Sequence, residues 1–325
     1  MSQSSAKAAD LSSQAAERRR GDSTTHGERM KVAITGASGL VGTELSKLLQ
    51  REGHSVIPVV RRKADHEQIA WRPSEGRIDP KDFEGIDAVV HLGGDNIAEG
   101  RWNAEKKRLI RDSRVKSTEL LSKTLAGLDQ KPRVFVCASA IGIYGDQRPD
   151  AVDEDAGKGE GFLADVCQDW EDACKATRDA GIRTVNVRIG VVLSKNGGAL
   201  AKMLTPFKMC AGGIIGSGQQ IWSWVSIDDV VGAINHAIEN ESIDGPLNAT
   251  SPNASSNAQF TKALGHVLGR PTLIPMPAFA ARMALGEMAD ALLLSSSRVK
   301  PKKLLETGYD FKHEDLEATL RALLK

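Results

Sequence analysis

Short apolar runs alternate with longer segments of helical period through the first two thirds of the chain. The runs have the length of buried strands, and the segments between them place apolar residues three and four positions apart, as in helices packed on a sheet. Strands are predicted at 32–35, 55–60, 87–91, 133–138 and 184–192, and helices from Leu40 to a stop at Gly53, at 103–128 and at 161–180. This alternation predicts an α/β fold with a doubly wound parallel sheet.

The first strand leads directly into a glycine-spaced loop and a helix. Gly36 permits a tight turn, Gly39 lets the backbone approach a pyrophosphate, and Gly42 lets the helix pack closely on the strand. The helix amino terminus then faces the phosphates of a dinucleotide. Glycine-rich turns also join strands and helices in unrelated proteins. The prediction therefore depends largely on the strand before the loop and the helix after it. The predicted contacts are Gly36, Ser38, Gly39, Leu40, Val41 and Gly42.

The end of the second predicted strand distinguishes the two nicotinamide cofactors. An Asp or Glu that binds the ribose would indicate NAD, but this chain has Arg61-Arg62-Lys63 there. A basic cluster at that position suits the extra phosphate of NADP. A solvated charge run at a strand end is the alternative. We therefore expect NADP as the cofactor, with Arg61 as the first contact.

Ligands of such sheets lie outside the carboxyl ends of the strands, so the loops at 91–94 and 138–141 should face the cofactor. Leu92 and Gly93 are predicted contacts in the first of these loops, although a plain turn explains the glycines of that loop almost as well. We also expect Arg114, on the helix that follows, among the cofactor contacts.

Composition and charge narrow the choice of function. Of the 325 residues, 41% are hydrophobic and 26% are charged, and the net charge is +1. The balanced charge and the lack of a zinc or helix-turn-helix motif argue against a nucleic-acid-binding protein. No apolar stretch reaches the ~20 residues of a membrane helix. The four cysteines have no metal-ligand spacing, so we expect no metal site and a cytoplasmic location.

Three segments are predicted along the chain. Residues 1–29 are polar and contain no apolar signal segment, which predicts a disordered tail. An organelle transit peptide is the weaker alternative, because such peptides are acid-poor and this segment contains acidic residues. Residues 30–245 form the NADP-binding Rossmann domain. Residues 246–325 form a small, mostly helical C-terminal domain whose apolar positions, such as Leu264, Met283 and Met288, are available for burial. This domain is either a lid over a substrate cleft or the face of a homodimer.

Several motifs together resemble the extended branch of the short-chain dehydrogenase/reductase superfamily. They are Thr35-Gly36-x-x-Gly39-x-x-Gly42, His91-Leu92-Gly93-Gly94, Ser139 through Tyr144-Gly145, and Trp224 through Asp229. The segments 95–102, 110–114, 162–171 and 257–289 are similar to an atypical subgroup, the sugar-nucleotide epimerase-like family. The resemblance covers residues 30–325 and implies an NAD(P)-binding Rossmann fold with a C-terminal domain peculiar to that subgroup.

The sequence departs from the superfamily at the catalytic residues. Extended enzymes use a Tyr-x-x-x-Lys pair with a Glu one turn beyond the Lys. If Glu171 is that Glu, the pair is replaced by Leu163 and Cys167. These two residues belong to an apolar stripe at helical spacing, which favours packing over catalysis. Cys167 as a nucleophile stays open, although no base is evident beside it.

Replacement groups must come from loops around the same cleft. Ser139 stands one position before the usual catalytic serine and could reach the nicotinamide or the substrate. Tyr144 is the best proton donor candidate, and its alternative is a phenol packed at a strand end with its hydroxyl hydrogen-bonded. Ser139 and Tyr144 are therefore the predicted catalytic residues.

The substrate contacts are predicted from the same loops and from a second, glycine-rich stretch. Arg188 either anchors a phosphate or carboxylate of the substrate or pairs with a carboxylate of the protein. The stretch 212–218 is expected to be flexible and to close over the substrate, with Asp228 capping the next helix. Trp222 and Trp224 would otherwise alternate on one strand, with one ring in the core. The predicted contacts are Asn96, Arg101, Arg188, Gln219 and Trp222.

Three hypotheses for function follow. The first is an NADP-dependent oxidoreductase or epimerase of the extended short-chain type, acting on a nucleotide-sugar-like or other small polar substrate through a nonstandard proton donor. The second is an NADP-binding regulatory protein without turnover, which the missing Tyr and Lys favour. The third is a division-associated scaffold protein that uses the C-terminal helices. A small-molecule substrate and a possible homodimer are the expected partners, with no nucleic acid and no membrane span.

Overall fold

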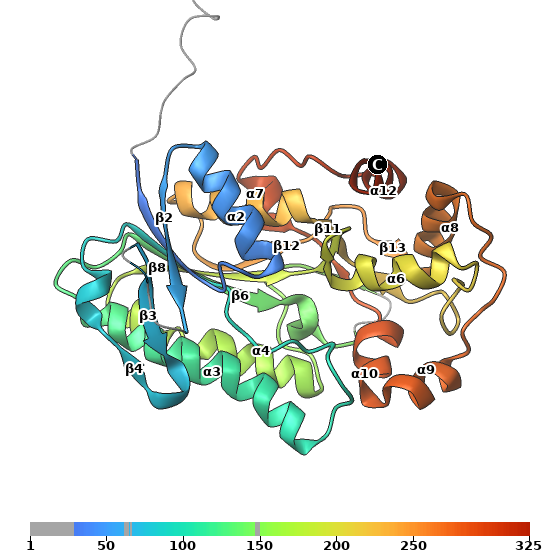
Figure 1. Ribbon diagram of the computed structural model, residues 1–325, viewed down its shortest axis with the longest axis horizontal. Helices are drawn as coiled ribbons and strands as arrows, with labels where there is room; N and C mark the ends of the chain where they lie inside the picture. The colour runs from blue at the N-terminus through green and yellow to red at the C-terminus, as the bar shows by residue number, and fades with distance from the viewer. Residues whose placement is uncertain (1–28, 62–64, 66, 147–149) are drawn as a thin grey trace, which may run out of the picture. The chain divides into compact units, whose positions relative to one another are not determined.

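The structure is a computed structural model that describes residues 29–61, 65, 67–146 and 150–325 (Figure 1). Residues Lys31–Lys325 form one compact unit. The tail predicted at 1–29 lies almost entirely outside the described residues. Arg62 and Lys63 of the predicted basic cluster also lie outside them.

An eight-stranded sheet forms the centre of this unit, in the strand order β12-β8-β6-β5-β1-β2-β3-β4. All neighbouring strands pair in parallel except β3 and β4. The strands are β1 (Lys31–Thr35), β2 (Ser55–Val60), β3 (Ile69–Arg72), β4 (Arg77–Ile78), β5 (Ala88–His91), β6 (Val134–Ala140), β8 (Arg183–Ile189) and β12 (Gly245–Ala249). The chain winds from β1 to one side through β2 and β3, then to the other side through β5, β6 and β8. The predicted doubly wound sheet is therefore confirmed, and its direction reverses between β1 and β5.

Helices cover both faces of the sheet (Figure 1). Helices α2 (Leu40–Arg51) and α7 (Ile227–Glu239) lie on one face, and α3 (Ala104–Ala126), α4 (Phe162–Asp172) and α5 (Lys175–Asp179) lie on the other. The helix predicted at 161–180 is thus two helices. Because both faces are covered, the central strands are mainly apolar; Val32, Ala33 and Ile34 are fully buried.

The strand predicted at 184–192 is also two elements, β8 and β9 (Val191–Ser194), which meet at Gly190. A Cβ at Gly190 would lie 2.4 Å from the Ser223 carbonyl oxygen, so this close backbone approach admits only glycine. Strand β9 leaves the main sheet to pair with β11 (Trp224–Ser226). The other short pairs are β10 (Ile221–Trp222) with β13 (Ser255–Ser256), and β7 (Ala151–Val152) with β14 (Arg298–Val299).

One further prediction about this region, and one alternative left open for it, are wrong. Ser226, not Asp228, caps α7, because the Ser226 hydroxyl accepts a hydrogen bond of 3.0 Å from the Asp229 backbone N–H. Trp222 and Trp224 do not alternate on one strand; they lie on β10 and β11, which pair with different partners, and both rings are buried.

The carboxyl-terminal region is mostly helical, as predicted. Its core joins α6, α8 and α12 around buried side chains that include Trp224, Phe260 and Leu320. Met283 is 73% exposed, contrary to its predicted burial. Strand β12 begins at the boundary predicted between the two domains, and the division of the chain into domains stays a prediction. The helices are α6 (Gly198–Lys208), α8 (Asn257–Leu268), α9 (Ala278–Leu285), α10 (Glu287–Ala289), α11 (Lys302–Glu306) and α12 (Leu316–Leu324).

Candidate cofactor and substrate site

The glycine loop between β1 and α2 is as tight as its spacing predicts. Gly36 has a φ of +69°, and the Gly39 N–H donates to the Gly36 carbonyl at 2.9 Å. A Cβ at Gly42 would lie 2.2 Å from that same carbonyl oxygen, so only glycine fits. Gly39 is exposed and no described side chain caps α2. The backbone N–H groups of the first turn are therefore available to an anion.

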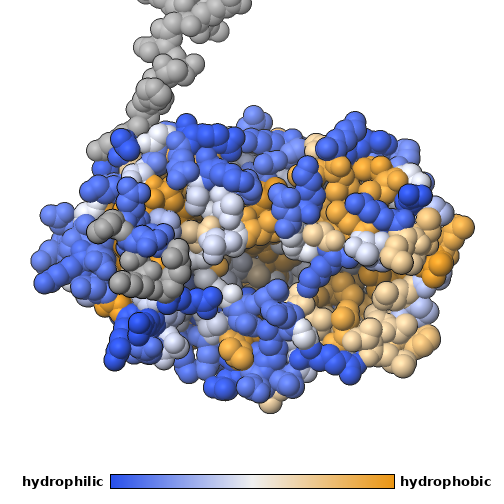
Figure 2. All heavy atoms as spheres, in the orientation of Figure 1, coloured by the Kyte–Doolittle hydropathy of each residue, from blue (hydrophilic) through white to orange (hydrophobic). Residues whose placement is uncertain are grey.

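The other predicted contacts of this loop lie on its surface. Ser38 is exposed, and Leu40 and Val41 are half-buried at the start of the helix. The face of the molecule shown in Figure 2 is hollowed near its centre, where Figure 1 draws the start of α2 and the carboxyl end of β6. This position matches the crevice where doubly wound sheets bind their ligands, at the point where the strand order reverses.

Two polar residues that sequence reasoning missed hold the loop after β5 against the end of β1. The Thr35 hydroxyl accepts hydrogen bonds from the Leu92 and Gly93 N–H groups at 3.1 and 3.2 Å, and lies 2.6 Å from His91 Nδ1. Burial, with a smaller effect of Arg114, lowers the pKa of His91 to about 3. His91 is thus a neutral structural residue. Both residues could have been identified from the sequence, because each is a polar residue at the last position of an apolar strand.

Arg61 lies just past the end of β2 and is exposed. It forms no ion pair with any residue that the structure describes, whereas Arg72 and Arg77 on the neighbouring strands pair with Glu75. Its guanidinium is therefore free to meet an anionic group of a ligand. Among the residues that the structure describes, no interaction assigns it another function.

Arg114 reaches from α3 to the loop after β5. Its guanidinium donates to the carbonyl oxygens of Ile110 and Asp95, each at 3.0 Å, and its Cζ lies 5.1 Å from the centroid of the Trp170 ring. A Cβ at Gly94 would lie only 3.1 Å from that Cζ. The structure therefore places Arg114 beside the predicted cofactor loop.

Ser139, Tyr144 and Arg188 belong to one buried network at the carboxyl ends of β6 and β8. Arg188 donates to both carboxylate oxygens of Glu171 at 2.9 Å, and Ser139 donates to Oε1 at 2.7 Å. Tyr144 accepts from Arg188 and donates to the Asn248 side-chain oxygen, both at 2.8 Å. The bond to the Glu171 carboxylate raises the pKa of Arg188 even though burial opposes this.

This network favours the structural alternatives left open for Arg188 and Tyr144. Tyr144 is fully buried, and burial raises the pKa of its hydroxyl to about 12. A proton donor at neutral pH needs a lower pKa and contact with the ligand. Arg188 is 7% exposed and paired with a protein carboxylate, and Ser139 is 3% exposed with its hydroxyl turned to Glu171. In this arrangement all three side chains are hydrogen-bonded to protein groups.

Helix α4 carries Leu163 and Cys167, which the sequence predicts at the positions of the missing Tyr and Lys. Burial, reinforced by the Glu171 carboxylate, raises the pKa of Cys167 to about 12. Its thiol stays protonated at neutral pH, which argues against a nucleophile. A Cβ at Gly142 would lie 3.3 Å from the Leu163 Cβ, so Leu163 packs against the segment that leads to Tyr144. Both residues pack against the backbone at Gly142.

The remaining predicted substrate contacts are dispersed. The Asn96 side chain closes its own loop by accepting from the Ala98 N–H at 3.0 Å, and Arg101 donates to the Met283 carbonyl on α9. Gln219 is exposed. Trp222 is 5% exposed and packs on Phe260, with ring centroids 5.4 Å apart, so it belongs to the core.

The glycine-rich stretch 212–218 is packed, contrary to the prediction that it is free to close. Two backbone hydrogen bonds join it to Met276. The Gly216 N–H donates to the Met276 carbonyl, and the Met276 N–H donates to the Ile214 carbonyl. A Cβ at Gly213 would lie 1.8 Å from the Ile274 carbonyl oxygen. These glycines therefore permit close packing of two segments.

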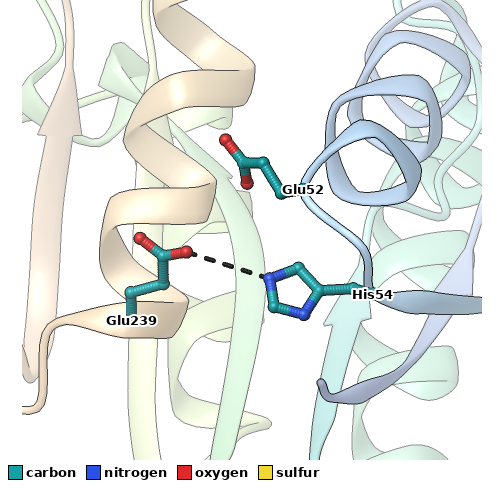
Figure 3. Close-up of side chains that lie close together, drawn as sticks. All are labelled: Glu52, His54 and Glu239. Carbon is teal, nitrogen blue, oxygen red and sulfur yellow. Dashed lines mark ion pairs between the residues drawn. The ribbon is translucent and has the colours of Figure 1, made fainter. Parts of the chain in front are cut away.

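A second polar cluster lies at the opposite edge of the sheet, before β2. Glu52, His54 and Glu239 place three candidate ligand atoms within 4.8 Å of one another, and His54 Nε2 is 3.8 Å from Glu239 Oε1 (Figure 3). Burial and the Glu239 charge raise the pKa of Glu52. Both glutamates are exposed and His54 is buried, so two of the three candidate ligand groups lie in solvent.

Apolar surface gathers over the segment after α8 and over α9 (Figure 2). The exposed side chains there are Leu273, Ile274, Met276, Phe279 and Met283. Contact with a second copy of the chain stays a prediction for this surface. Among the described residues, no helix has the length and apolar character to cross a membrane.

Comparison with known proteins places this geometry in a family. Residues 32–248 match the NAD dependent epimerase/dehydratase family, and residues 276–323 match a domain of unknown function, DUF1731. The chain is 42% identical over 290 residues to the epimerase family protein ML0860 of Mycobacterium leprae, covering 89% of this chain and 94% of the relative. It is 37% identical over 301 residues to the epimerase family protein YfhF of Bacillus subtilis, covering 91% and 98%.

A solved structure extends these matches to the fold. The crystal structure of the human epimerase family protein SDR39U1 (isoform 2) with NADPH has a TM-score of 0.83 and 34% identity, over 90% of this chain and 99% of that chain. The resemblance that the motifs indicated is confirmed. The chain belongs to the NAD dependent epimerase/dehydratase family, as an epimerase family protein of the SDR39U1/YfhF type with a carboxyl-terminal DUF1731 region.

Proposed function

We propose that this chain binds NADP(H) in the crevice between β1 and β5 and uses it to carry hydride in the oxidation, reduction or epimerisation of a small polar, nucleotide-sugar-like substrate. The observation that carries the proposal is the uncapped start of α2 behind a glycine loop that admits no Cβ at Gly42, at the point where the strand order reverses. The proposed cofactor contacts are Gly36, Ser38, Gly39, Leu40, Val41, Gly42, Arg61, Leu92, Gly93 and Arg114.

The choice of NADP over NAD rests on charge at the end of β2. Arg61 is exposed there and forms no ion pair with the described residues, so its charge is available to the phosphate on the adenosine ribose. A human relative with 34% identity was crystallised with NADPH, which supports the same choice. NAD lacks that phosphate and gains nothing from Arg61.

On the substrate side, Asn96, Arg101 and Gln219 are the proposed contacts that remain exposed. Arg101 bonds the backbone of α9, so the loop that carries it is joined to the DUF1731 region. A substrate in the cleft would therefore meet groups from both matched segments. This arrangement supports a small polar substrate.

A second function, cofactor binding without turnover, is favoured by one observation. The positions of the usual Tyr and Lys hold Leu163 and Cys167, and the Cys167 thiol has a pKa of about 12. The nearest phenol, Tyr144, is fully buried. In this second function the bound cofactor would stabilise the fold or control a partner, with no hydride transfer.

The test is a fluorescence titration of the full chain with NADPH and NADH, repeated on Arg61→Asp. We expect the wild type to bind NADPH more tightly than NADH, and Arg61→Asp to weaken NADPH binding by about 10- to 100-fold while NADH changes by less than about twofold. Arg72→Asp is the matched control, because Arg72 is an exposed arginine on the neighbouring strand β3. Failure of the wild type to bind either cofactor would overturn the proposal.

Turnover separates the two functions. NADPH oxidation is followed by absorbance with a panel of nucleotide sugars and carbonyl compounds, and exchange of label from a deuterated substrate reports epimerisation. Any Arg61-dependent turnover establishes the enzyme. Tight binding with no turnover and no exchange across the panel favours the second function.

A further inference from the structure

Two carboxylates and a histidine meet beside the ends of α2 and α7, at the amino edge of the sheet. Figure 3 shows the side chains of Glu52, His54 and Glu239 pointing toward one another; we call these three residues the amino-edge cluster. Glu52 and His54 flank Gly53, whose φ of +91° makes a tight turn between α2 and β2. The Glu52 and His54 N–H groups both donate to carbonyls of α2, at 3.1 and 2.9 Å. The turn therefore fixes the backbone of these two residues opposite Glu239, the last residue of α7.

The two carboxylates of this cluster lack a close cationic partner. Neither forms an ion pair with a lysine or arginine among the described residues, and His54 Nε2 lies 3.8 Å from Glu239 Oε1, too far for a hydrogen bond. Burial raises the pKa of Glu52, and the Glu239 charge raises it further. The charge of Lys312 lowers the pKa of Glu52, but by less than Glu239 raises it. A bound cation would remove this repulsion between the carboxylates.

A buried acceptor without a partner lies at the same place. Asn235 stands one helical turn before Glu239 on α7 and is 7% exposed. The hydrogen bond from its amide lowers the pKa of Glu52, so the amide contacts that carboxylate. Its Oδ1, in contrast, has no hydrogen-bond partner among the described residues. A buried oxygen of this kind calls for a donor, and a water held by an ion between the carboxylates would supply one.

Two other pairs of a histidine with a carboxylate show what is particular to the amino-edge cluster. His266 lies 3.0 Å from Glu317, and Arg321 already neutralises that carboxylate. His313 lies 3.3 Å from Asp228, without a second carboxylate close by. Among the residues that the structure describes, only the amino-edge cluster brings three candidate ligand atoms within 4.8 Å of one another.

The donor set of the cluster suits a divalent transition-metal ion. Zn²⁺ binds imidazole nitrogen and carboxylate oxygen at about 2.0–2.2 Å, so two ligand atoms on one ion lie about 3–4 Å apart. The distance between His54 Nε2 and Glu239 Oε1 falls in this range. His54 is buried and fixes one ligand in advance, whereas the exposed glutamates can rotate toward the ion. The expectation of no metal site rested on cysteine spacing, and this cluster contains no cysteine.

We propose that the amino-edge cluster is a zinc-type metal site, in which His54 Nε2 and the carboxylates of Glu52 and Glu239 bind the ion and Asn235 Oδ1 accepts from a water on it. The imidazole favours Zn²⁺ over Mg²⁺, which prefers oxygen ligands alone. The ion joins the end of α2 to the end of α7 and stabilises their packing. This site lies at the opposite edge of the sheet from the crevice, so the inference is independent of the proposed function.

The first experiment measures Zn²⁺ affinity by calorimetry on untagged, full-length protein freed of metal with a chelator. We expect Glu239→Gln and His54→Gln to weaken Zn²⁺ binding by at least about 100-fold, and Asn235→Leu by about 10-fold. Glu241→Gln is the matched control, because Glu241 is an exposed carboxylate two residues beyond Glu239, and it should stay within about twofold of the wild type. Mg²⁺ should bind the wild type at least about 100-fold more weakly than Zn²⁺.

The second experiment separates a metal site from a surface ion pair. With Zn²⁺ about 100-fold above its Kd, the melting temperature of the wild type should rise by about 5 °C, and that of Glu239→Gln by less than about 1 °C. Without metal, Glu239→Gln should melt no lower than the wild type, because it removes one of two carboxylates that repel each other. NADPH affinity should stay within about twofold in every variant.

Equal Zn²⁺ affinity in the wild type and Glu239→Gln, or no Zn²⁺ binding by the wild type, overturns the inference. So does a Glu239→Gln variant that melts lower without metal and responds to Zn²⁺ as the wild type does, since the cluster would then be an ion pair. If His54→Gln does not fold, Glu239→Gln decides, because it changes an exposed side chain. Failure of the wild type to bind NADPH would count against the proposed function alone and would leave these measurements as they are.

Discussion

The carboxyl edge of the sheet has two halves that use their polar groups differently. Around β1 and β5, the backbone at Gly39 and the Arg61 side chain are exposed, and the start of α2 has no side-chain cap among the described residues. Arg114 bonds only backbone carbonyls there. Around β6, β8 and β12, the polar groups of Ser139, Arg188 and Asn248 stand in one row across the sheet and bond one another, Glu171 or Tyr144.

This difference indicates that the half around β1 and β5 is suited to binding a ligand, whereas the half around β6, β8 and β12 supports the structure behind it. The first half leaves donors without protein acceptors, which is unfavourable in a folded protein unless a ligand or water meets them. The second half satisfies its buried groups internally, so it adds rigidity behind the crevice. Each half can be perturbed alone, because among the described residues the side-chain hydrogen bonds of Glu171 and Arg188 do not reach the glycine loop.

The largest expected effect comes from Glu171→Ala. It leaves Arg188 buried without its carboxylate, and breaking a buried ion pair costs about 3–5 kcal/mol. Urea unfolding should show this loss in the free energy of unfolding, while NADPH affinity of the folded protein stays within about twofold. Asp169→Ala on the same helix is the control, because its pair with Arg111 is half-exposed and is worth less than about 1 kcal/mol. A loss below about 1 kcal/mol for Glu171→Ala would contradict the supporting role of the network.

The next effect comes from Gly42→Ala in the binding half. A Cβ there would lie 2.2 Å from the Gly36 carbonyl oxygen, so α2 must move away from the loop and its N–H groups lose their place. We expect NADPH affinity to fall by about 100-fold, which is roughly 3 kcal/mol. Fluorescence titration measures it, with Gly157→Ala as the control, since nothing lies within 4 Å of a Cβ at that position. Equal affinity in the two variants would show that the loop does not hold the cofactor.

A smaller effect is the pH dependence of stability that arises from His91. This residue lies in the binding half but is completely buried, so its titration tests where that half stops being open to water. Its pKa is about 3 in the folded chain against 6.5 when unfolded. Between these values only the unfolded chain binds the proton, so stability is complete above pH 6.5 and is lost as the pH falls toward 3. The slope is on the order of 1 kcal/mol per pH unit.

Denaturation of wild type and His91→Gln between pH 7.5 and 4.5 isolates this contribution, since carboxylates titrate alike in both proteins. We expect the wild type to lose stability faster than the variant below pH 6.5. Parallel curves would mean that His91 is protonated in the folded chain and that this part of the crevice admits water.

Sequence patterns predicted one half of the edge better than the other, for a physical reason. The glycine loop and its strand and helix are local in sequence, so spacing alone predicts their geometry at Gly36 and Gly42. The Tyr144–Asn248 hydrogen bond joins residues 104 positions apart, and no local pattern indicates such a partner. The packing of Gly213 against Ile274 escaped prediction for the same reason, because a glycine that permits close approach has the same sequence signal as one in a mobile loop.

The smallest expected effect decides whether the supporting half has any chemical function. Tyr144→Phe removes a hydroxyl that donates to Asn248 and accepts from Arg188, which should lower the free energy of unfolding by about 1 kcal/mol. Because the phenol is fully buried with a pKa of about 12, we expect NADPH affinity and the rate of NADPH oxidation in a single turnover to change by less than about threefold. A fall of 100-fold in that rate at unchanged affinity would instead identify Tyr144 as the proton donor. The network would then have to open during the reaction, since a proton can leave the phenol only if its bond to Asn248 breaks.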